Sequence, residues 1–578
     1  MHLLVNWTFH GDPQSMCHCL LQPLFAVCCI IGVLAACDVR AEKPAPVALW
    51  KLSGDVRDHS GNGHHGQNHG VDLSKPAPAP RSGRAAFFDG RESHVEVPHG
   101  EQLELGTDDF SITAWVHTAE DLDDVLGDVL SKYDPRSRRG FVLSLKHNVG
   151  GTTSQANYRH VQFGIDNGRL DNSWTDRGRP GEAVLIYALA VHDGQLFAGT
   201  CVAGKDKAGR VFRFDGDRSW IDCGAPDRCN AVSTLAVYEG KLYAGVSKYR
   251  LAGSSLTESE NPHDGGTIYR YEGDRQWVSV GTLPDVQAIN GMVVYRGKLY
   301  ASSMYAPAGL FRYDGDSSWS DCGSPGGKRV EALCVYNGNL FATGYDEGAV
   351  YRYDGSDWTH CGRLGDNTQT YGFAIHHGQL YVSTWRSGRV YRYAGDNDWV
   401  DVGRLGDELE VMGMAVYNGK LYAGTLPLAA VYRYDGLGHW HNTGRVDRTP
   451  EVRYRRAWTM AVYDGKLFVG TLPSGHVMSI EAGKSVTLDR ELPSGWVHLA
   501  AVKSHDRLKL YLNGKFAAQS SVFDAADYDL TNTQPLTIGF GPHDYLNGQL
   551  SDVRLYRQAL SEEDVERIAG EKQGSARP

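Results

Sequence analysis

The stretch TLAVYEGKLYAGV, residues 234–246, is one of seven versions of the same phrase in this chain. The other six begin at Ala188, Gly291, Ala332, Gly372, Gly413 and Thr459. Each version has two runs of apolar and aromatic residues around a turn that ends in Gly, which predicts a β-hairpin. A run like VYRYDG and a run around a Trp follow the first six, so each unit holds four predicted strands. Repeats of about 40 residues with four strands indicate the blades of a β-propeller.

The seventh unit has no Trp run of its own, but SWTDRGRPG, which begins at Ser173, precedes the first unit. We therefore predict that this segment supplies the outer strand of the last blade and closes a seven-bladed ring over residues 172–483. The repeated tryptophans are expected to pack between blades. They are Trp174, Trp220, Trp277, Trp319, Trp358, Trp399 and Trp440.

The flanking segments do not repeat, and they contain DHSGNGHHG from Asp58, FSITAWV from Phe110 and GWVHLAAV from Gly495. Together with the closing GQLSDVRLY, these motifs resemble a laminin-G-like, concanavalin-A-like jelly roll of the pentraxin kind. The resemblance implies one all-β sandwich in two parts, residues 42–171 and 484–570, followed by a tail at 571–578. The propeller would interrupt it between VQFGID and SVTLD, with the sandwich on the face that carries the hairpin turns. The opposite face would be free.

The same resemblance implies a Ca²⁺ ion near the DHSGNG turn and the closing strand. The matching residues are Asp58, Asn62 and Asp552, whose oxygen atoms suit that ion. Ser551 stands where the family often has a second acid, so Asp58 could instead only stabilise a turn. The histidine-rich stretch at 59–70 offers transition-metal ligands, but a polar loop is the preferred interpretation.

Composition and the N-terminus indicate where the protein acts. The net charge of −11 and the lack of a long basic run disfavour nucleic-acid binding. The apolar run LFAVCCIIGVLAAC at 24–37 fits the core of an export signal, so residues 1–41 are predicted to be a leader. LAAC at 34–37 resembles a bacterial lipobox, which would place a lipid on Cys37, and cleavage after Ala41 is the alternative. We expect export, to the bacterial cell envelope by a lipid anchor or as a secreted protein. Six further cysteines, all in the propeller, could form disulfides or be buried thiols.

No motif of a known active site is present. G-x-S-x-G, H-E-x-x-H and the P-loop are missing, and the Asp-box of sialidases is not reproduced. Glycoside hydrolysis needs two carboxylates across a cleft. The candidates on the predicted free face are Asp346, Glu347, Asp366, Asp407 and Glu410.

The loops of the free face are instead rich in aromatic residues that could stack on sugar rings or anchor a protein partner. The predicted ligand-binding residues are Tyr249, Tyr305, Tyr345, Asp346, Tyr371, Trp385, Arg386 and Trp458. The long segment 247–266 could form a lid, and RYRRAW at 453–458 could hold an anionic group. The sequence thus predicts an exported protein that binds glycans or cell-surface proteins. The alternatives are an extracellular carbohydrate-active enzyme with its site at the propeller mouth and a structural surface protein.

Overall fold

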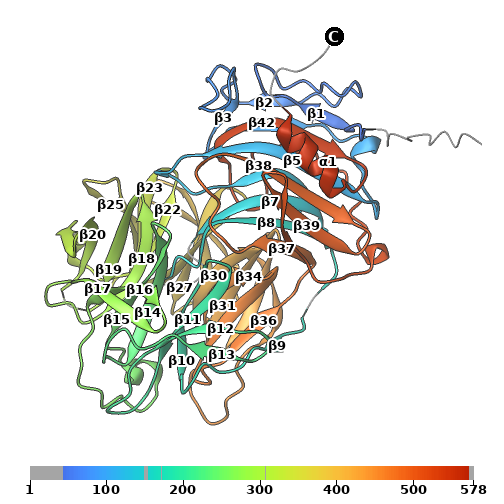
Figure 1. Cartoon of the computed structure of the whole chain (residues 1–578). Helices are drawn as coiled ribbons and strands as arrows, with labels where there is room; N and C mark the ends of the chain where they lie inside the picture. Colours follow the sequence, from blue (N-terminus) through green and yellow to red (C-terminus); the bar gives the residue numbers. More distant parts are fainter. Residues whose placement is uncertain (1–42, 149–153, 171, 306, 572–578) are drawn as a thin grey trace, which may run out of the picture. The chain divides into compact units, whose positions relative to one another are not determined.

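The computed structural model of the chain describes residues 43–148, 154–170, 172–305 and 307–571. The chain divides into two compact units, residues 1–43 and 44–578, and the second contains both predicted domains. The predicted leader with Cys37 lies outside the described residues, as does the tail beyond 571. Within the described ranges the fold is all-β (Figure 1), as predicted, with one short α-helix, α1 (Glu562–Gly570). None of the helices in those ranges has the length and apolar character needed to span a membrane.

The propeller strands form antiparallel units of four, and two pairs of neighbouring units are joined into eight-stranded sheets. The first strands of the units are β10 (Leu185–His192), β14 (Ala231–Tyr238), β18 (Ile289–Tyr295), β22 (Val330–Tyr336), β26 (Gln369–His376), β30 (Glu410–Tyr417) and β34 (Arg456–Tyr463). The second strands are β11 (Gln195–Cys201), β15 (Lys241–Ser247), β19 (Lys298–Ser303), β23 (Asn339–Gly344), β27 (Gln379–Trp385), β31 (Lys420–Leu426) and β35 (Lys466–Leu472). Neighbouring first strands contact one another, so they form the inner wall of the ring.

The outer half of each unit holds the VYRYDG and Trp runs. The third strands are β12 (Val211–Phe214), β16 (Thr267–Gly273), β20 (Gly309–Gly315), β24 (Ala349–Tyr353), β28 (Arg389–Gly395), β32 (Ala430–Gly436) and β36 (Val477–Ile480). The fourth strands are β13 (Trp220–Asp222), β17 (Gln276–Thr282), β21 (Ser318–Asp321), β25 (Trp358–Arg363), β29 (Asp398–Arg404), β33 (His439–Arg445) and β9 (Thr175–Asp176). As the sequence predicts, β9 comes from upstream of the first unit and pairs with β36 of the last.

The repeated tryptophans join each unit to the one before it. In six units the indole Nε1 donates a hydrogen bond of 2.6–2.9 Å to a backbone carbonyl of the preceding outer strand or the residue after it, as Trp277 does to Cys223. Trp220 donates to the carbonyl of Arg177, directly after β9, and Trp174 donates to Thr443 Oγ1 at 3.3 Å. These bonds complete the circle, so the predicted role of the tryptophans between blades is confirmed.

The sandwich is built from both flanks of the chain. One sheet holds β1 (Ala48–Trp50), β3 (Ala86–Asp89), β5 (Phe110–Thr118), β38 (Gly495–Ser504), β39 (Arg507–Leu512), β40 (Lys515–Gln519) and β42 (Asn547–Tyr556). The other holds β2 (Gln67–His69), β4 (His94–Val97), β6 (Asp128–Asp134), β7 (Arg139–Asn148), β8 (Asn157–Asn167), β37 (Lys484–Leu488) and β41 (Leu536–Ile538). Each sheet mixes strands from before and after the propeller.

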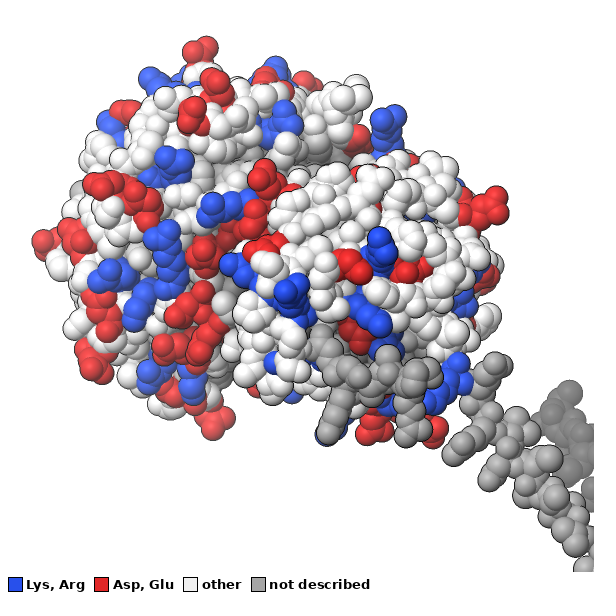
Figure 2. Space-filling model, turned by 90° about the horizontal axis from the view of Figure 1, so that it is seen from above, with Lys and Arg blue, Asp and Glu red and all other residues white. Residues whose placement is uncertain are grey.

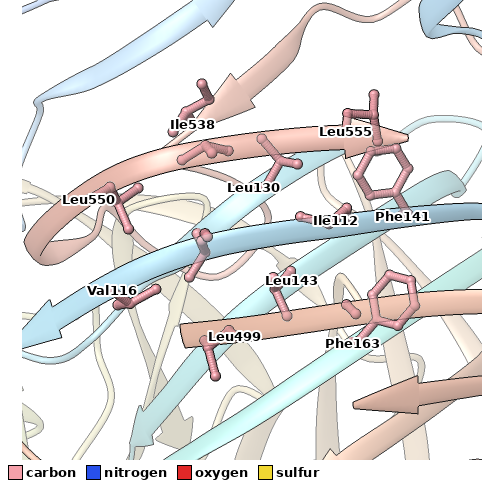
Figure 3. Close-up of a cluster of buried hydrophobic side chains, with 14 of the residues drawn as sticks. Ile112, Val116, Leu130, Phe141, Leu143, Phe163, Leu499, Ile538, Leu550 and Leu555 are labelled. Atoms are coloured by element: carbon pink, nitrogen blue, oxygen red, sulfur yellow. The ribbon is translucent and has the colours of Figure 1, made fainter. Parts of the chain in front are cut away.

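Apolar side chains on the inner faces of the two sheets form one core (Figure 3). Ile112 and Leu499 come from the first sheet and meet Leu143 and Phe163 from the second. These residues stand at alternate positions of their strands, and they are fully or almost fully buried. The period of two puts one side of each strand into the core, which is the physical basis of a sandwich. Neither flank could bury this surface without the other.

The propeller enters and leaves the sandwich between two neighbouring strands. β8 and β37 pair in antiparallel register, from Ile165 opposite Lys484 to Val161 opposite Leu488. The chain leaves β8 to form β9, and it returns from β36 into β37. The insertion therefore replaces a simple hairpin, which is the position that the sequence predicts.

The hairpin turns of the repeat lie against the sandwich, as expected. In all seven turns both central residues have positive φ, the type I′ geometry, as in Asp193–Gly194. Several turns donate backbone N–H groups to the sandwich. Gly194 donates to the Asp489 carbonyl at 2.7 Å, and Arg296 donates to the Leu122 carbonyl at 3.0 Å. The repeated x-Gly turn is thus also the surface on which the second domain rests.

Buried polar side chains strengthen this contact. Asn157 of β8 donates from Nδ2 to the carbonyl of Val462 at 2.7 Å and accepts from the N–H of Val462 at 3.0 Å. The Lys146 ammonium donates to the Val416 carbonyl at 2.6 Å. Since all these groups are buried, losing one partner leaves the other without water to replace it.

The surface of the molecule is of mixed charge. On the face seen in Figure 2, acidic and basic side chains lie interspersed among uncharged ones. Over the described surface many charged side chains pair, as Arg567 does with Asp564 at 3.0 Å. Exposed pairs of this kind contribute little to stability.

We expect Asn157→Ala to lower the free energy of unfolding by about 2–4 kcal/mol, because it leaves a buried N–H and a buried carbonyl of the propeller unpaired. Urea denaturation followed by tryptophan fluorescence measures this change. Asn397→Ala, at an exposed position, is the control and should change stability by less than about 0.5 kcal/mol. An equal effect of both substitutions would contradict a structural role for the Asn157 bridge.

Candidate functional site: the axial cavity of the propeller

Two positions at or near the start of the first strand of each repeat supply seven of the residues that line a cavity of the propeller. In each unit the first position lies three residues before the run that reads AVY in the second unit (residues 236–238). It holds Tyr187, Ser233, Asn290, Glu331, Tyr371, Met412 and Trp458. The second lies two residues earlier and holds Leu185, Ala231, Ala288, Arg329, Gln369, Glu410 and Arg456. The repeat is regular elsewhere and irregular here, so the axis carries chemistry that the scaffold does not need.

These positions contribute to a cavity of about 520 Å³ on the face away from the sandwich. Eight aromatic side chains line it: Tyr187, Tyr249, Tyr305, Tyr345, Tyr371, Trp385, Tyr454 and Trp458. Tyr187, Tyr249 and Trp458 pack edge to face, with ring centroids 5.0–5.9 Å apart. Such contacts hold aromatic rings in fixed orientations. The cavity therefore has a rigid aromatic wall.

Two buried carboxyl groups and one buried guanidinium line the same space. Glu331 and Glu410 are each 1% exposed, and Arg456 is 6% exposed. Arg456 Nη2 lies 3.6 Å from Glu410 Oε2. Arg456 Nη1 also donates to Ser254 Oγ at 2.7 Å, which ties it to the 3₁₀ helix η2 (Leu251–Ser254) in the long loop after β15.

The two carboxyl groups differ in their surroundings. Burial raises the pKa of Glu331 to about 8, and the nearby Glu410 carboxylate adds to the rise, so Glu331 is largely protonated at neutral pH. Burial also raises the pKa of Glu410, but the Arg456 guanidinium opposes the shift. Among the described residues, Glu331 Oε2, Glu410 Oε1 and Arg456 Nε have no hydrogen-bond partner. The cavity thus presents polar atoms that a ligand can satisfy.

The structure brings together six of the eight residues predicted to bind a ligand. Tyr249, Tyr371 and Trp458 are buried in the wall, and Tyr305, Tyr345 and Trp385 are half-buried around it. The remaining two do not line the cavity. Asp346 accepts hydrogen bonds from the N–H and guanidinium of Arg329, and Arg386 is exposed.

Of the five acids considered for hydrolysis, Glu410 alone lines this cavity. Asp346 pairs with Arg329, and Glu347 pairs with Lys328 at 2.5 Å. The long loop 247–266 borders the cavity through Arg250 and Glu258, and Arg250 lies over the Tyr305 ring at 4.4 Å from its centroid. The RYRRAW segment contributes Tyr454, Arg456 and Trp458.

Sequence reasoning missed Glu331 and Tyr187. Both occupy the inner-strand position that also holds Tyr371 and Trp458, which were predicted. An alignment of the seven repeats against one another would have found them, because their column holds six different residue types, with Tyr twice. A polar residue in the middle of a predicted innermost strand is a signal of this kind.

The residues that the resemblance implies for Ca²⁺ have other partners. Asp58 accepts hydrogen bonds from the backbone N–H groups of Leu49, Ser60 and His64. Asn62 donates to the Val47 carbonyl. Asp552 forms a two-point pair with Arg554, at 2.8 Å for each bond. Calcium at this site stays a prediction, and it would require these carboxylates to exchange partners.

The six propeller cysteines are free thiols, five of them buried. Cys223, Cys322 and Cys361 occupy equivalent positions at the outer strands of three different units. Their backbone carbonyls accept the indole hydrogen bonds of the next unit. These cysteines therefore act as small side chains at the contact between blades.

A second cavity, of about 510 Å³, lies between the sandwich and the propeller. His192 and Tyr271 of the propeller border it together with Arg490 and Glu491. It has fewer aromatic side chains than the axial cavity, and Glu491 is the one acid on its sandwich side. The axial cavity is therefore the stronger candidate for ligand recognition.

Comparison with known proteins supports the fold. Residues 447–566 match the family model Laminin_G_3, described as the concanavalin A-like lectin/glucanases superfamily. The match begins in the propeller and ends in α1, and the chain combines such a domain with a propeller. No curated protein matches the sequence.

Solved propellers are similar over about half of the chain. A catalytically inactive virginiamycin B lyase from Staphylococcus aureus, solved with quinupristin, has 12% identity and a TM-score of 0.42, over 54% of this chain and 99% of its own. A streptogramin B lyase has 10% identity and a TM-score of 0.42, over 54% and 97%. The WD40 repeats of RRP9 have 14% identity and a TM-score of 0.38, over 54% and 99%. At these values no argument about function rests on them.

Glu331→Gln should remove a pH-dependent loss of stability. The pKa of Glu331 in the folded protein lies above its ordinary value of 4.5, so the wild type loses stability as pH rises from there to about 8. The glutamine variant has no ionisable group at this position, so it should not lose stability in this way. We expect the stability of the variant relative to the wild type to increase by up to about 4 kcal/mol between about pH 5 and pH 8.

Thermal and urea unfolding across this pH range measure the difference. Glu101→Gln, at an exposed position of the sandwich, is the control and should show a flat difference. A flat difference for Glu331→Gln as well would contradict the buried, protonated state of this carboxyl group.

Proposed function

We propose that the protein binds carbohydrate in the axial cavity of its propeller. The observation that carries this proposal is a concave space of about 520 Å³ in which aromatic rings surround two buried carboxyl groups and a guanidinium. Ligand pockets have this size and this combination of an apolar wall with a few polar groups. The jelly roll, on the opposite side of the ring, would serve as a support or as a second recognition module.

The chemistry of the wall suits a sugar. The faces of aromatic rings pack against the C–H faces of sugar rings, and Trp385 is a half-buried aromatic of the cavity wall that could make this contact. Sugar hydroxyl groups both donate and accept hydrogen bonds. They could therefore bond to Glu331, Glu410 and Arg456, which line the cavity and, among the described residues, each have one buried atom without a hydrogen-bond partner.

The concave form favours a saccharide over a protein partner. Standard protein interfaces bury about 800 Å² on each partner, and an enclosed pocket offers little of such an area. A purely structural role would suit an axis filled by apolar side chains, and here the axis holds acids and an arginine. The predicted export signal and the lipid at Cys37 belong to the same proposal, since they would bring the cavity into contact with extracellular glycans.

A glycan array probed with the purified chain should identify a ligand, and calorimetry should then give its affinity. Trp385→Ala should weaken binding roughly tenfold or more, because it removes a half-buried ring from the cavity. Phe516→Ala, which removes an exposed ring from the sandwich, should leave the affinity unchanged. Binding of the same glycan by intact cells that make the chain would test export.

No glycan binding by the folded chain would contradict the proposal. Equal losses from the two substitutions would place the binding site outside the cavity. Binding that persists in Trp385→Ala but is lost after changes in the jelly roll would assign recognition to the second domain.

Cleavage of a glycosidic bond is a second candidate, favoured by the Glu331–Glu410 pair. Glycoside hydrolysis uses one protonated and one ionised carboxyl group. Glu331, with its pKa raised to about 8, fits the general acid, and Glu410, beside Arg456, fits the ionised partner. Both line the same cavity.

Release of reducing ends from the bound glycan measures this activity. Glu331→Gln should lower the rate by about 10²-fold or more, because glutamine cannot give up a proton to the leaving oxygen, while the affinity changes far less. Glu101→Gln again is the control. A glycan that binds but is never cleaved by the wild type would exclude hydrolysis of that ligand and leave the binding function in place.

A further inference from the structure

The edge of the second sheet of the sandwich brings two histidines and a glutamate together. β2 and β4 pair in antiparallel register, with His69 opposite His94 and Gln67 opposite Glu96. Because side chains alternate along a strand, His94 and Glu96 lie on one face, and His69 joins them from the neighbouring strand. One ligand atom from each of the three residues lies within 4.8 Å of the others.

We propose that His69, His94 and Glu96 bind a divalent transition-metal ion, with Zn²⁺ as the best fit. Imidazole nitrogens and a carboxylate oxygen form the two-histidine, one-glutamate ligand set that this ion accepts, and water completes the coordination. Zinc bonds of 2.0–2.2 Å require the three atoms to move closer by about 1 Å, which rotations of exposed or half-exposed side chains supply. The proposal is independent of the axial cavity.

Hydrogen bonds prepare His94 for this role. Its Nδ1 lies 3.0 Å from the Glu92 carbonyl, which can only accept, so Nδ1 carries the proton and Nε2 keeps its lone pair. Metal-binding histidines are commonly oriented in this way by a backbone carbonyl. The rings of His69 and His94 are stacked, with centroids 4.5 Å apart and planes at 7°.

The backbone on both sides of the pair is also fixed. The Asn68 side chain accepts from the N–H of Val71 at 2.8 Å and donates to its carbonyl at 3.0 Å, which closes the loop that contains His69. Ser93, directly before His94, exchanges hydrogen bonds with Asp89. Sites supported in this way on paired strands hold their ligands more precisely than free loops.

The charges also favour a cation. Within the described part of the chain, the side chains of Glu96 and His69 have no hydrogen bond and no ion pair. The carboxylate of Glu96 therefore lacks a positive partner, although it is only half-exposed. A metal ion would supply that charge and would join β2, a three-residue strand at the edge of the sheet, to β4.

Isothermal titration of the full chain with ZnCl₂ tests the proposal. The chain should carry no polyhistidine tag and should first be treated with a chelator. We expect one zinc site that weakens roughly tenfold or more in His94→Gln and in Glu96→Gln. His505→Gln, which changes an exposed histidine of the sandwich, should bind zinc as the wild type does. Circular dichroism would show that each variant is folded, and Co²⁺ in place of zinc gives a visible spectrum that reports its ligands.

Zinc should also slow hydrogen exchange of the β2 amides in the wild type and not in Glu96→Gln. No zinc binding by the wild type would overturn the proposal. Zinc binding of equal affinity in the wild type and in both variants would overturn it as well, since other histidines or cysteines would then hold the ion.

Discussion

The pairing of β8 with β37 is the constraint on which the rest of the structure depends. These two strands are hydrogen-bonded neighbours, so the residues that follow β8 and precede β37 must begin and end at almost the same point. A closed ring is a natural way for some 300 residues to return to their origin. The last blade then lies beside the entry point, and β9 can pair with β36 there. The indole bonds from Trp174 and Trp220 connect that seam to the units on either side.

The same constraint separates the two faces of the ring. The type I′ turns lie against the sandwich and donate backbone N–H groups to it. The long loops and the axial cavity are consequently left on the other face. The type I′ turns match the twist of the strands that they join, and they occupy the face next to the sandwich. A ligand can therefore approach the axial cavity from the opposite face.

Most of the fold could be predicted from the sequence, because each repeated sequence unit corresponds to one repeated structural unit. Seven related hairpins, one displaced Trp run and the motifs of the flanks were enough to predict the propeller, its seam and the split sandwich. The candidate site was predicted only in part. Tyr305, in a loop, and Trp385, the last residue of β27, were found, but Glu331, inside strand β22, was not. Asp346 was misleading for the opposite reason: its position in a loop does not show that Arg329 already satisfies it. Which side chains pair depends on how the folded chain brings them together, and a single sequence does not show this.

The division of the sandwich has a consequence for how the protein is made. Residues 44–167 leave the ribosome before any of the strands β37–β42 exist, so Ile112 and Phe163 then have no opposing residues. At about 5–20 residues per second, the interval until Lys484 appears is roughly 15–60 s. During that time the nascent half-sandwich exposes apolar surface, and chaperones that bind such surface would find it. The growing propeller completes all seven of its units in the same interval, because the outer strand of the last unit is β9, so the propeller is ready as a platform when the second half of the sandwich arrives.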